Sequence, residues 1–371
     1  MIEPIFSVKV QFYGQRAQTI NPAYVSITQE EYKHDILTMQ IFADDSTVPA
    51  YLSGAPVNVT FGRPTSKRTF YGYVNHVKRL NKSLSTVESP EDANSTVITC
   101  VGASYFMKQA GTESWTNQTA SQVVKQIAKK FNLATDIEDS KTVWPSLQMN
   151  GQSYWEFCAE LAKRIGYTFY CNGVQLAFKN RPTNTKKITG NVYVYDYSKQ
   201  SIYLPEFHPT LGATSIEEGL LRRRELAGVN PRTTTLTFSK QDGSTFLPLL
   251  GLKQETPRFV EIEHTPSDSQ KETTARVKSL GAYNQMYLSA QAHLSGEPQV
   301  SQGSLIQILN ANGSQNGLWY VCKAHHYLDR WNYTTELQLG RDSIGESKNL
   351  VVKPQIATPP HARLTNNLWT T

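Results

Sequence analysis

The sequence predicts a mainly β protein with a small α+β insertion, flanked on each side by a β-barrel-like domain. Three observations lead to this fold class. Short runs of alternating apolar and polar residues, bounded by Gly, Pro and Asn turns, recur near both ends of the chain. Charged residues make up only 18% of the 371 residues, whereas aromatic residues make up 11%. Two capped amphipathic helices are predicted between the two β-rich parts.

Residues 1–110 are predicted to form the first β-barrel domain, because the alternation is regular and no long helical pattern interrupts it. A hairpin is expected at 62–65, where the residues are Gly-Arg-Pro-Thr and suit a tight reversal. The apolar residues that define the expected strands are Phe6, Val8, Val10, Val25, Ile27, Leu37, Met39, Ile41, Val57, Val59, Phe61, Phe70, Val77, Val97 and Val101.

Residues 111–190 are predicted to be the α+β insertion. Gly166 is placed to end the second of its two helices, and a β-hairpin is expected around the Asn-Gly pair at 172–173. Each helix begins with the S/T-x-x-E/Q pattern of a capping box. The two boxes are Thr119 with Gln122 and Ser153 with Glu156.

Residues 191–345 are predicted to form the second β-barrel domain. A β-meander is expected over 305–339; its first strand follows Gly303 and ends before the Asn-Gly pairs at 312–313 and 316–317. Pro205 places the strand 202–207 near a sheet edge. The longest helix of the chain is expected at 270–294, lying across one face of the barrel. The polar and Pro-rich segment 346–371 is predicted to be an extended C-terminal tail that contacts a partner.

Three tyrosines alternate along one predicted strand, which gives that strand an aromatic face. They could form a stacking platform for single-stranded nucleic acid or glycan. Sheet packing or a protein interface is favoured over a stacking platform, because no basic residues lie between the tyrosines. The three residues are Tyr193, Tyr195 and Tyr197.

The net charge of +6 is mild and neither requires nor excludes contact with nucleic acid. The densest charge cluster, EEGLLRRRE, spans 217–225. One interpretation is a solvated surface in which Glu218 pairs with Arg222 at i,i+4 spacing on a helix. The other is that three copies arranged about an axis form a cationic ring where DNA or a partner passes. The basic residues concerned are Arg222, Arg223 and Arg224.

No catalytic, cofactor-binding or metal-binding motif is present, and no enzymatic activity or cofactor is expected. GxSxG, HExxH, Walker A and helix-opening GxGxxG patterns are all missing. His325 and His326 are adjacent on a predicted strand, so they point to opposite faces and cannot share a metal. The pairs Glu30-Glu31 and Asp44-Asp45 could supply the two carboxylates of a glycosidase, but solvated acids near turns are expected instead.

The four cysteines are scattered without a CxxC pair, and buried free thiols are expected. The first residues lack the basic and apolar regions of a secretory signal, so cytoplasmic synthesis is expected. No membrane span is expected either. The cysteines are Cys100, Cys158, Cys171 and Cys322.

Two patterns together resemble phage baseplate hub proteins, the family that includes late control D proteins and the N-terminal hub region of VgrG spike proteins. The first pattern is SxWEFxxxLAxxxGYxF, carried by Ser153, Trp155, Phe157, Leu161, Ala162, Gly166, Tyr167 and Phe169. The second is a glycine-bounded strand followed by GxWYVxKAxH and a Tyr-Thr-Thr strand. It is carried by Gly303, Gly317, Trp319, Val321, His326, Tyr333, Thr335, Leu337 and Arg341. The helix at 119–131 also faintly resembles a LysM peptidoglycan-binding module, although core packing explains it as well.

The resemblance to the hub family implies a structural role. Such proteins form a homotrimer whose two tube-like domains imitate six subunits, adapting a sixfold tail tube to a threefold spike and serving as a conduit for DNA. The implied partners are the chain itself, a tail tube protein, a spike protein and other baseplate proteins, and the implied location is the virion. The alternatives are a tail-tip protein that binds or cleaves peptidoglycan, and the hub of a type VI-like injection system.

Overall fold

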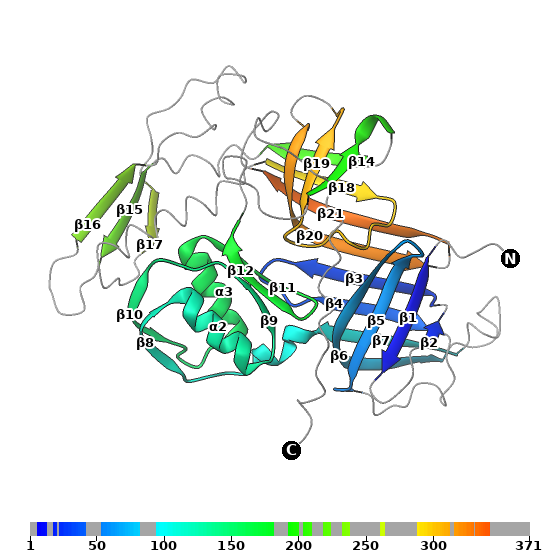
Figure 1. The fold of residues 1–371 in the computed structure, drawn as a ribbon, viewed down its shortest axis with the longest axis horizontal. Coiled ribbons are helices and arrows are strands. Elements are labelled where there is room, and N and C mark those ends of the chain that lie inside the picture. Colours follow the sequence, from blue (N-terminus) through cyan, green and yellow to red (C-terminus); the bar gives the residue numbers. More distant parts are fainter. Residues whose placement is uncertain are drawn as a thin grey trace.

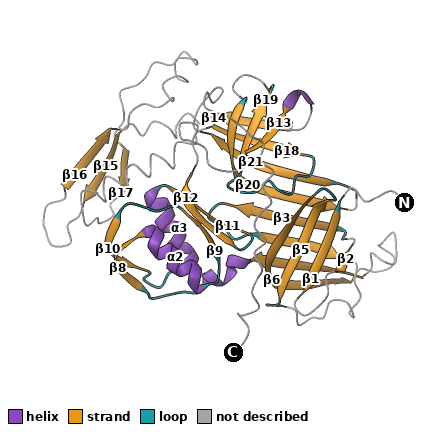
Figure 2. Cartoon of the chain, viewed as in Figure 1, coloured by secondary structure: helices purple, strands orange, loops and turns teal. Residues whose placement is uncertain are grey.

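The computed structural model confirms a mainly β fold with an α+β insertion (Figures 1 and 2). Among the residues it describes, no helix is long and apolar enough to cross a bilayer. The described residues are 6–12, 18–20, 22–41, 53–81, 94–181, 192–199, 203–209, 218–223, 232–237, 260–263, 288–311, 315–329 and 331–341.

The first part of the chain forms strands where the alternation predicts them, with the apolar member of each pair buried. The predicted reversal at 62–65 joins two strands in a hairpin whose register begins at Arg63 opposite Ser66. The elements are β1 Ser7–Phe12, β2 Gln18–Ile20, β3 Tyr24–Glu30, β4 Ile36–Ile41, β5 Pro56–Arg63, β6 Ser66–Asn81, β7 Asn94–Gly102 and the 3-10 helix η3 Ala103–Lys108.

The insertion contains both α-helices of the described chain (Figure 2). Both predicted capping boxes are formed, and Gly166 ends the second helix with a φ of 74°. The elements are β8 Ser114–Thr119, α2 Ala120–Lys130, β9 Ala134–Ile137, β10 Val143–Gln148, α3 Tyr154–Ile165, β11 Tyr167–Asn172 and β12 Gln175–Asn180.

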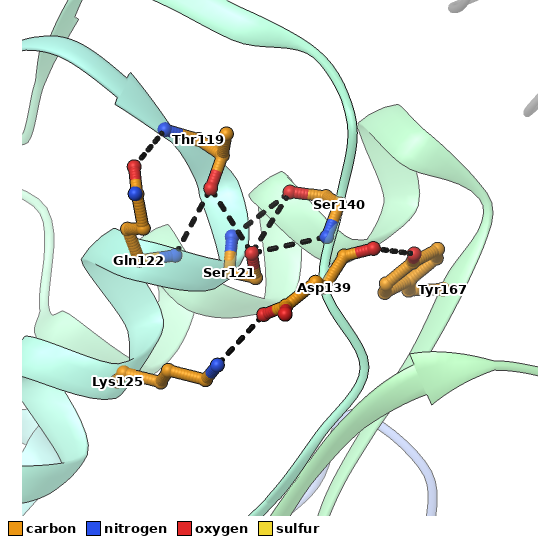
Figure 3. Close-up of polar contacts among 7 residues, drawn as sticks. All are labelled: Thr119, Ser121, Gln122, Lys125, Asp139, Ser140 and Tyr167. Atoms are coloured by element: carbon orange, nitrogen blue, oxygen red, sulfur yellow. Dashed lines mark hydrogen bonds and ion pairs between the residues drawn. The ribbon is translucent and has the colours of Figure 1, made fainter.

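The start of α2 is held by a reciprocal pair of serines (Figure 3). The backbone N–H of Ser121 donates to Ser140 Oγ at 3.0 Å, and the N–H of Ser140 donates to Ser121 Oγ at 3.0 Å. Lys125 Nζ also lies 2.7 Å from Asp139 Oδ1. These contacts satisfy a helix N-terminal donor and tie the loop before β10 to the helix.

The last part of the chain returns to strands. The predicted meander is confirmed as β19, β20 and β21, with Gly317 at a positive φ of 118° after the turn. The elements are β13 Val192–Asp196, η4 Tyr197–Lys199, β14 Tyr203–Pro209, β15 Glu218–Arg223, β16 Arg232–Thr237, β17 Val260–Glu263, β18 Leu288–Leu294, β19 Leu305–Leu309, β20 Gly317–Asp329 and β21 Tyr333–Arg341.

Strands from the two ends of the chain belong to one hydrogen-bonded sheet of thirteen strands. Its order is β14-β18-β21-β20-β3-β4-β7-β6-β5-β1-β2, with β19 also pairing β20 and β13 pairing β19. The connection is the antiparallel pair β3–β20, which runs from Glu30 opposite Lys323 to Tyr24 opposite Asp329. Figure 1 shows β3, in blue, beside β20, in orange. The smaller sheets are β8–β10, β9–β12–β11 and β15 between β16 and β17.

Each part of the chain has its own apolar core. One cluster fills the insertion around α2 and α3, and another joins β18–β21. The cluster of the first part also includes Leu328 and Tyr333, which come from β20 and β21. The hydrophobic contacts therefore cross the β3–β20 boundary along with the hydrogen bonds.

The prediction of a helix over 270–294 is wrong where the structure describes it, because Leu288–Leu294 is strand β18. Ala290, Ala292 and Leu294 are buried and alternate with residues outside the core, which is the period of a strand. The helix expected over 270–294 therefore does not extend to the end of that segment. The remainder, 270–287, lies outside the described residues.

Packing explains two of the three tyrosines predicted to share a strand, whereas Tyr197 lies beyond the strand, in η4, and is exposed. Tyr193 and Tyr195 of β13 pack against the core of β18–β21, as the favoured interpretation predicted. Pro205 lies in β14, which is the terminal strand of the sheet path among the described strands. All four cysteines are free thiols: three are buried, and Cys322 is half-buried.

We predict that Ser153→Ala lowers the free energy of unfolding by about 1 kcal/mol, because the N-cap hydroxyl is lost from α3. Ser153→Thr keeps an oxygen that can accept from the Glu156 N–H and should lose much less. Urea denaturation of both variants measures the difference. Equal stability of the Ala and Thr variants would show that the cap is unimportant.

Candidate functional site: the junction and the polar face of the sheet

The first set of motif residues builds the insertion and docks it on the sheet. Phe157, Leu161 and Tyr167 are buried within the insertion core. Trp155 reaches beyond it: its Nε1–H donates to the backbone oxygen of Tyr32 at 3.0 Å, and its ring lies 4.1 Å from that of His34. The turn between β3 and β4 is thereby held against α3.

The second set of motif residues begins with an aromatic and cationic pair at the end of β21. Trp319 is fully buried and donates from Nε1 to the oxygen of Gln315. Arg341 lies over the Trp319 ring at 5.3 Å from the centroid and donates to the oxygen of Asn316 at 2.5 Å. These contacts fix the turn before β20 against the end of β21, with Val321 buried beside them.

His326 is buried and lies among side chains of neighbouring strands. Its Nδ1 lies 3.1 Å from Thr335 Oγ1 and 3.2 Å from the hydroxyl of Tyr333, and its ring lies 5.5 Å from that of Phe61 in β5. Burial lowers the pKa of His326 well below its usual value, so the ring is neutral. His325 is partly exposed, so the two adjacent side chains point to opposite faces, as expected for a strand.

Gly303 permits a close approach between the insertion and the sheet. Its φ is +82°, and a Cβ at this position would lie 1.9 Å from the hydroxyl oxygen of Tyr170 in β11. Its N–H donates to the oxygen of Val321 at 2.8 Å. Only glycine fits here without displacing one of these neighbours.

A buried charged cluster centred on Glu31 joins three parts of the chain. Glu31 accepts hydrogen bonds from Arg181 at 2.6 Å, from the hydroxyl of Thr168 in β11 and from that of Tyr320 in β20. The Glu31 and Arg181 side chains are 6% and 12% exposed. We call Glu31, Asp35, Thr168, Arg181, Gln302 and Tyr320 the junction.

The second acid of the junction is Asp35. Gln29 Nε2 donates to its Oδ2 at 2.6 Å, and Gln302 Nε2 donates to its Oδ1 and to the oxygen of Cys171, both at 3.0 Å. Burial raises the pKa of the Asp35 carboxyl to about 7, against the opposing effect of these hydrogen bonds and of the charge on Arg68. The carboxyl therefore titrates near neutral pH.

The outward side chains of the central strands, opposite the apolar cores, are mostly polar; Ile36 also lies on this face and is exposed. The strand pairing brings three of them together: Ser26 Oγ lies 2.9 Å from His325 Nε2, and His325 Nδ1 lies 3.3 Å from Glu336 Oε2. No sequence motif indicated this cluster, because Ser26 and His325 are separated by 299 positions. We call the following residues the polar face: Ser26, Thr28, Thr38, Thr99, His325, Tyr327, Glu336 and Gln338.

The acids Glu30 and Glu31, considered as a glycosidase pair, lie in different surroundings. Glu31 is buried in the junction, which corrects the expectation that it is solvated. Glu30 points to the polar face and forms ion pairs with Lys33 at 2.7 Å and Lys323 at 3.9 Å. Asp44 and Asp45 lie outside the described residues, within which no group of acids, histidines and cysteines could hold a metal.

The arginine cluster is described only in part. Glu218, Arg222 and Arg223 lie in strand β15, so the i,i+4 spacing of Glu218 and Arg222 is not that of a helix. Arg224 lies outside the described residues.

The chain is similar to known proteins in fold more than in sequence. A family model described as YQBQ-like matches residues 27–202. No curated protein sequence matches significantly. The 43 kDa tail protein of prophage MuSo2 from Shewanella oneidensis aligns over 91% of this chain and 98% of its own, with 11% identity and a TM-score of 0.63. The tail protein from Neisseria meningitidis MC58 aligns over 92% and 98%, with 11% identity and a TM-score of 0.64.

A third similar structure is an Escherichia coli component of the type VI secretion system. It aligns over 89% of this chain and 76% of its own, with 9% identity and a TM-score of 0.54. At these identities the likeness concerns the fold. Because the alignments cover most of the chain, the shared fold includes both β parts and the insertion.

We predict that Glu31→Leu lowers the free energy of unfolding by about 3–5 kcal/mol, because Arg181 loses its buried carboxylate partner. The double change Glu31→Leu with Arg181→Leu should recover part of that loss. Breaking the exposed pair of Lys125 and Asp139 by Lys125→Met is the control, expected to cost less than about 1 kcal/mol. Equal losses at the two pairs in urea denaturation would contradict the prediction.

We predict a pH dependence from Asp35. Its pKa in the folded protein exceeds that of an unfolded chain, so folding favours the protonated form. The contribution of this carboxyl to the free energy of unfolding is therefore largest below about pH 4. It is lost as the pH rises through about 7.

Asp35→Asn should remove this component, whereas the control Asp139→Asn, at an exposed side chain, should not. Unfolding free energies measured across this pH range test the difference. Parallel curves for the wild-type protein and Asp35→Asn would refute it.

Proposed function

We propose that this chain is a structural subunit of a phage tail baseplate, in which three copies form a ring that acts as a hub. The observation that carries the proposal is the fold, shared over about nine-tenths of the chain with two solved tail proteins. The two motif sets support it, since they occupy the positions that fix the insertion to the sheet and the turns to one another. The role is mechanical and uses no cofactor.

In this proposal, residues 1–110 and 191–345 are two tube-like domains, and 111–190 is the insertion between them. The segment 346–371, predicted to be a tail, lies outside the described residues. The separate cores of the first and last parts support the division. The continuous β3–β20 ladder couples the two domains rigidly. With a rigid pair of similar domains in each chain, three chains would present six equivalent domains to a sixfold tail tube. The same three chains would present a threefold surface to a spike.

Open sheet edges suit assembly into a ring. Among the described strands, β14 and β2 end the sheet, and each has one hydrogen-bonded neighbour. Exposed edges pair readily with other chains, and a head-to-tail interface that closes produces a ring. The edges at the two ends of each copy would be covered by neighbouring copies.

The polar face suits a channel through which DNA passes. Its side chains are mostly uncharged hydroxyl and amide groups, which bind phosphate only weakly compared with arginine and lysine. A surface of this kind lets a polyanion move without being held. The arginines at 222–224 would then contribute charge at a separate place, against DNA in transit or against a partner.

The hub of a type VI-like injection system is the second candidate, supported by the likeness to the Escherichia coli type VI component. Both candidates require the same trimeric ring. They differ in the tube and spike proteins that bind it, so binding to purified tube and spike subunits of each system distinguishes them.

We predict that the purified chain alone has a native mass three times its chain mass of 41.7 kDa, or that its complex with the tail tube subunit contains three copies of the chain. Light scattering after gel filtration measures the mass, and electron micrographs viewed down the axis should show a ring with threefold symmetry. A stable dimer would contradict the proposal. So would a monomer that fails to bind both tube and spike subunits.

A further inference from the structure

The Ser26–His325–Glu336 cluster on the polar face has the connectivity of a nucleophile, a base and an orienting acid. The three residues come from adjacent strands β3, β20 and β21, so backbone pairing fixes their spacing. The two imidazole nitrogens have different partners: Nε2 lies 2.9 Å from Ser26 Oγ, and Nδ1 lies 3.3 Å from Glu336 Oε2. A proton on Nδ1, held by Glu336, leaves Nε2 to accept the proton of Ser26.

We propose that Ser26, His325 and Glu336 form a catalytic triad that hydrolyses small esters. Ser26 is the nucleophile, His325 the general base and then the general acid, and Glu336 the group that orients His325. The same division of roles on unrelated folds depends on geometry and not on sequence order. This function goes beyond the structural role and does not depend on it.

The reaction requires only the ester and water. Ser26 Oγ bonds to the ester carbonyl carbon as its proton moves to His325 Nε2. The C–O bond to the alcohol then breaks, and the alcohol leaves with that proton. Water attacks the acyl-Ser26 ester and gives a proton to Nε2; collapse returns this proton to Oγ and releases the carboxylic acid.

Two residues with hydroxyl side chains flank Ser26 in the strand register. Backbone N–H groups in a sheet are committed to neighbouring strands, so donors to the oxyanion must be side chains. The register places Thr38 and Tyr327 directly opposite Ser26 on its two sides, and their hydroxyls are the donors in this proposal. Tyr24 and Tyr327 stack with ring centroids 6.2 Å apart and give a surface for a ring-shaped or aromatic alcohol.

The exposure of the cluster determines what activity to expect. The side chains of His325 and Glu336 are 29% and 51% exposed, so water screens their interaction. Turnover should therefore be slow and restricted to activated esters. The same exposure makes the His325–Glu336 contact a minor source of stability, so function and folding can be tested separately.

The first test is covalent labelling of the full-length protein with a fluorophosphonate, followed by peptide mass spectrometry. The expected result is a single label on Ser26, absent from Ser26→Ala. His325→Asn should slow labelling by about 100-fold, because the general base is lost. Glu336→Gln should slow it by about tenfold or more. Gln338→Ala, on the same face of β21, is the matched control and should label at the wild-type rate.

The second test is hydrolysis of p-nitrophenyl acetate. Tyr327→Phe keeps the aromatic ring but removes one proposed oxyanion donor, so it should lower the rate by about 100-fold. Unchanged thermal unfolding of each variant shows that folding is intact. The proposal is overturned if wild-type protein is not labelled and hydrolyses the ester no faster than buffer. It is also overturned if Ser26→Ala labels like the wild type.

Discussion

The antiparallel pairing of β3 with β20 is the constraint on which the rest of the structure depends. It joins residues about 300 positions apart and makes one sheet from the two ends of the chain. Bringing such distant segments together costs loop entropy, which the contacts at the boundary must offset. Leu328 and Tyr333 do so by entering the core of the first part, and His326 packs beside Phe61.

The same pairing positions the junction. Glu31 directly follows β3, and Tyr320 lies within β20, so the two meet only because the strands pair. Arg181 and Thr168 then bring the insertion to the same carboxylate. Buried charges contribute little net stability when paired but are costly when misaligned. The junction therefore favours one orientation of the insertion over others that would bury the same apolar area.

This arrangement relates the structure to its proposed role. A hub that links parts of different symmetry has to transmit force without its domains separating, and a shared sheet with a buried polar junction resists that separation. The polar face lies on the opposite side of the same strands. The backbone ladder therefore fixes the spacing of the strand positions that carry its hydroxyl, imidazole and carboxylate groups.

The sequence by itself determined the local elements. The alternation of apolar and polar residues predicted most strands, and the capping boxes predicted the starts of α2 and α3. Glycines predicted the end of α3 and the β5–β6 hairpin. Each of these signals lies within a few residues of the sequence. The same reasoning failed at 288–294, where helical spacing was inferred for a strand, and at Glu31, which looks solvated from its neighbours alone. Only the tertiary structure decided that Glu31 is buried and that Ser26 meets His325. The burial of Glu31 and the Ser26–His325 contact both depend on the pairing of strands that are far apart in the sequence. Local residue patterns do not show which distant strands pair.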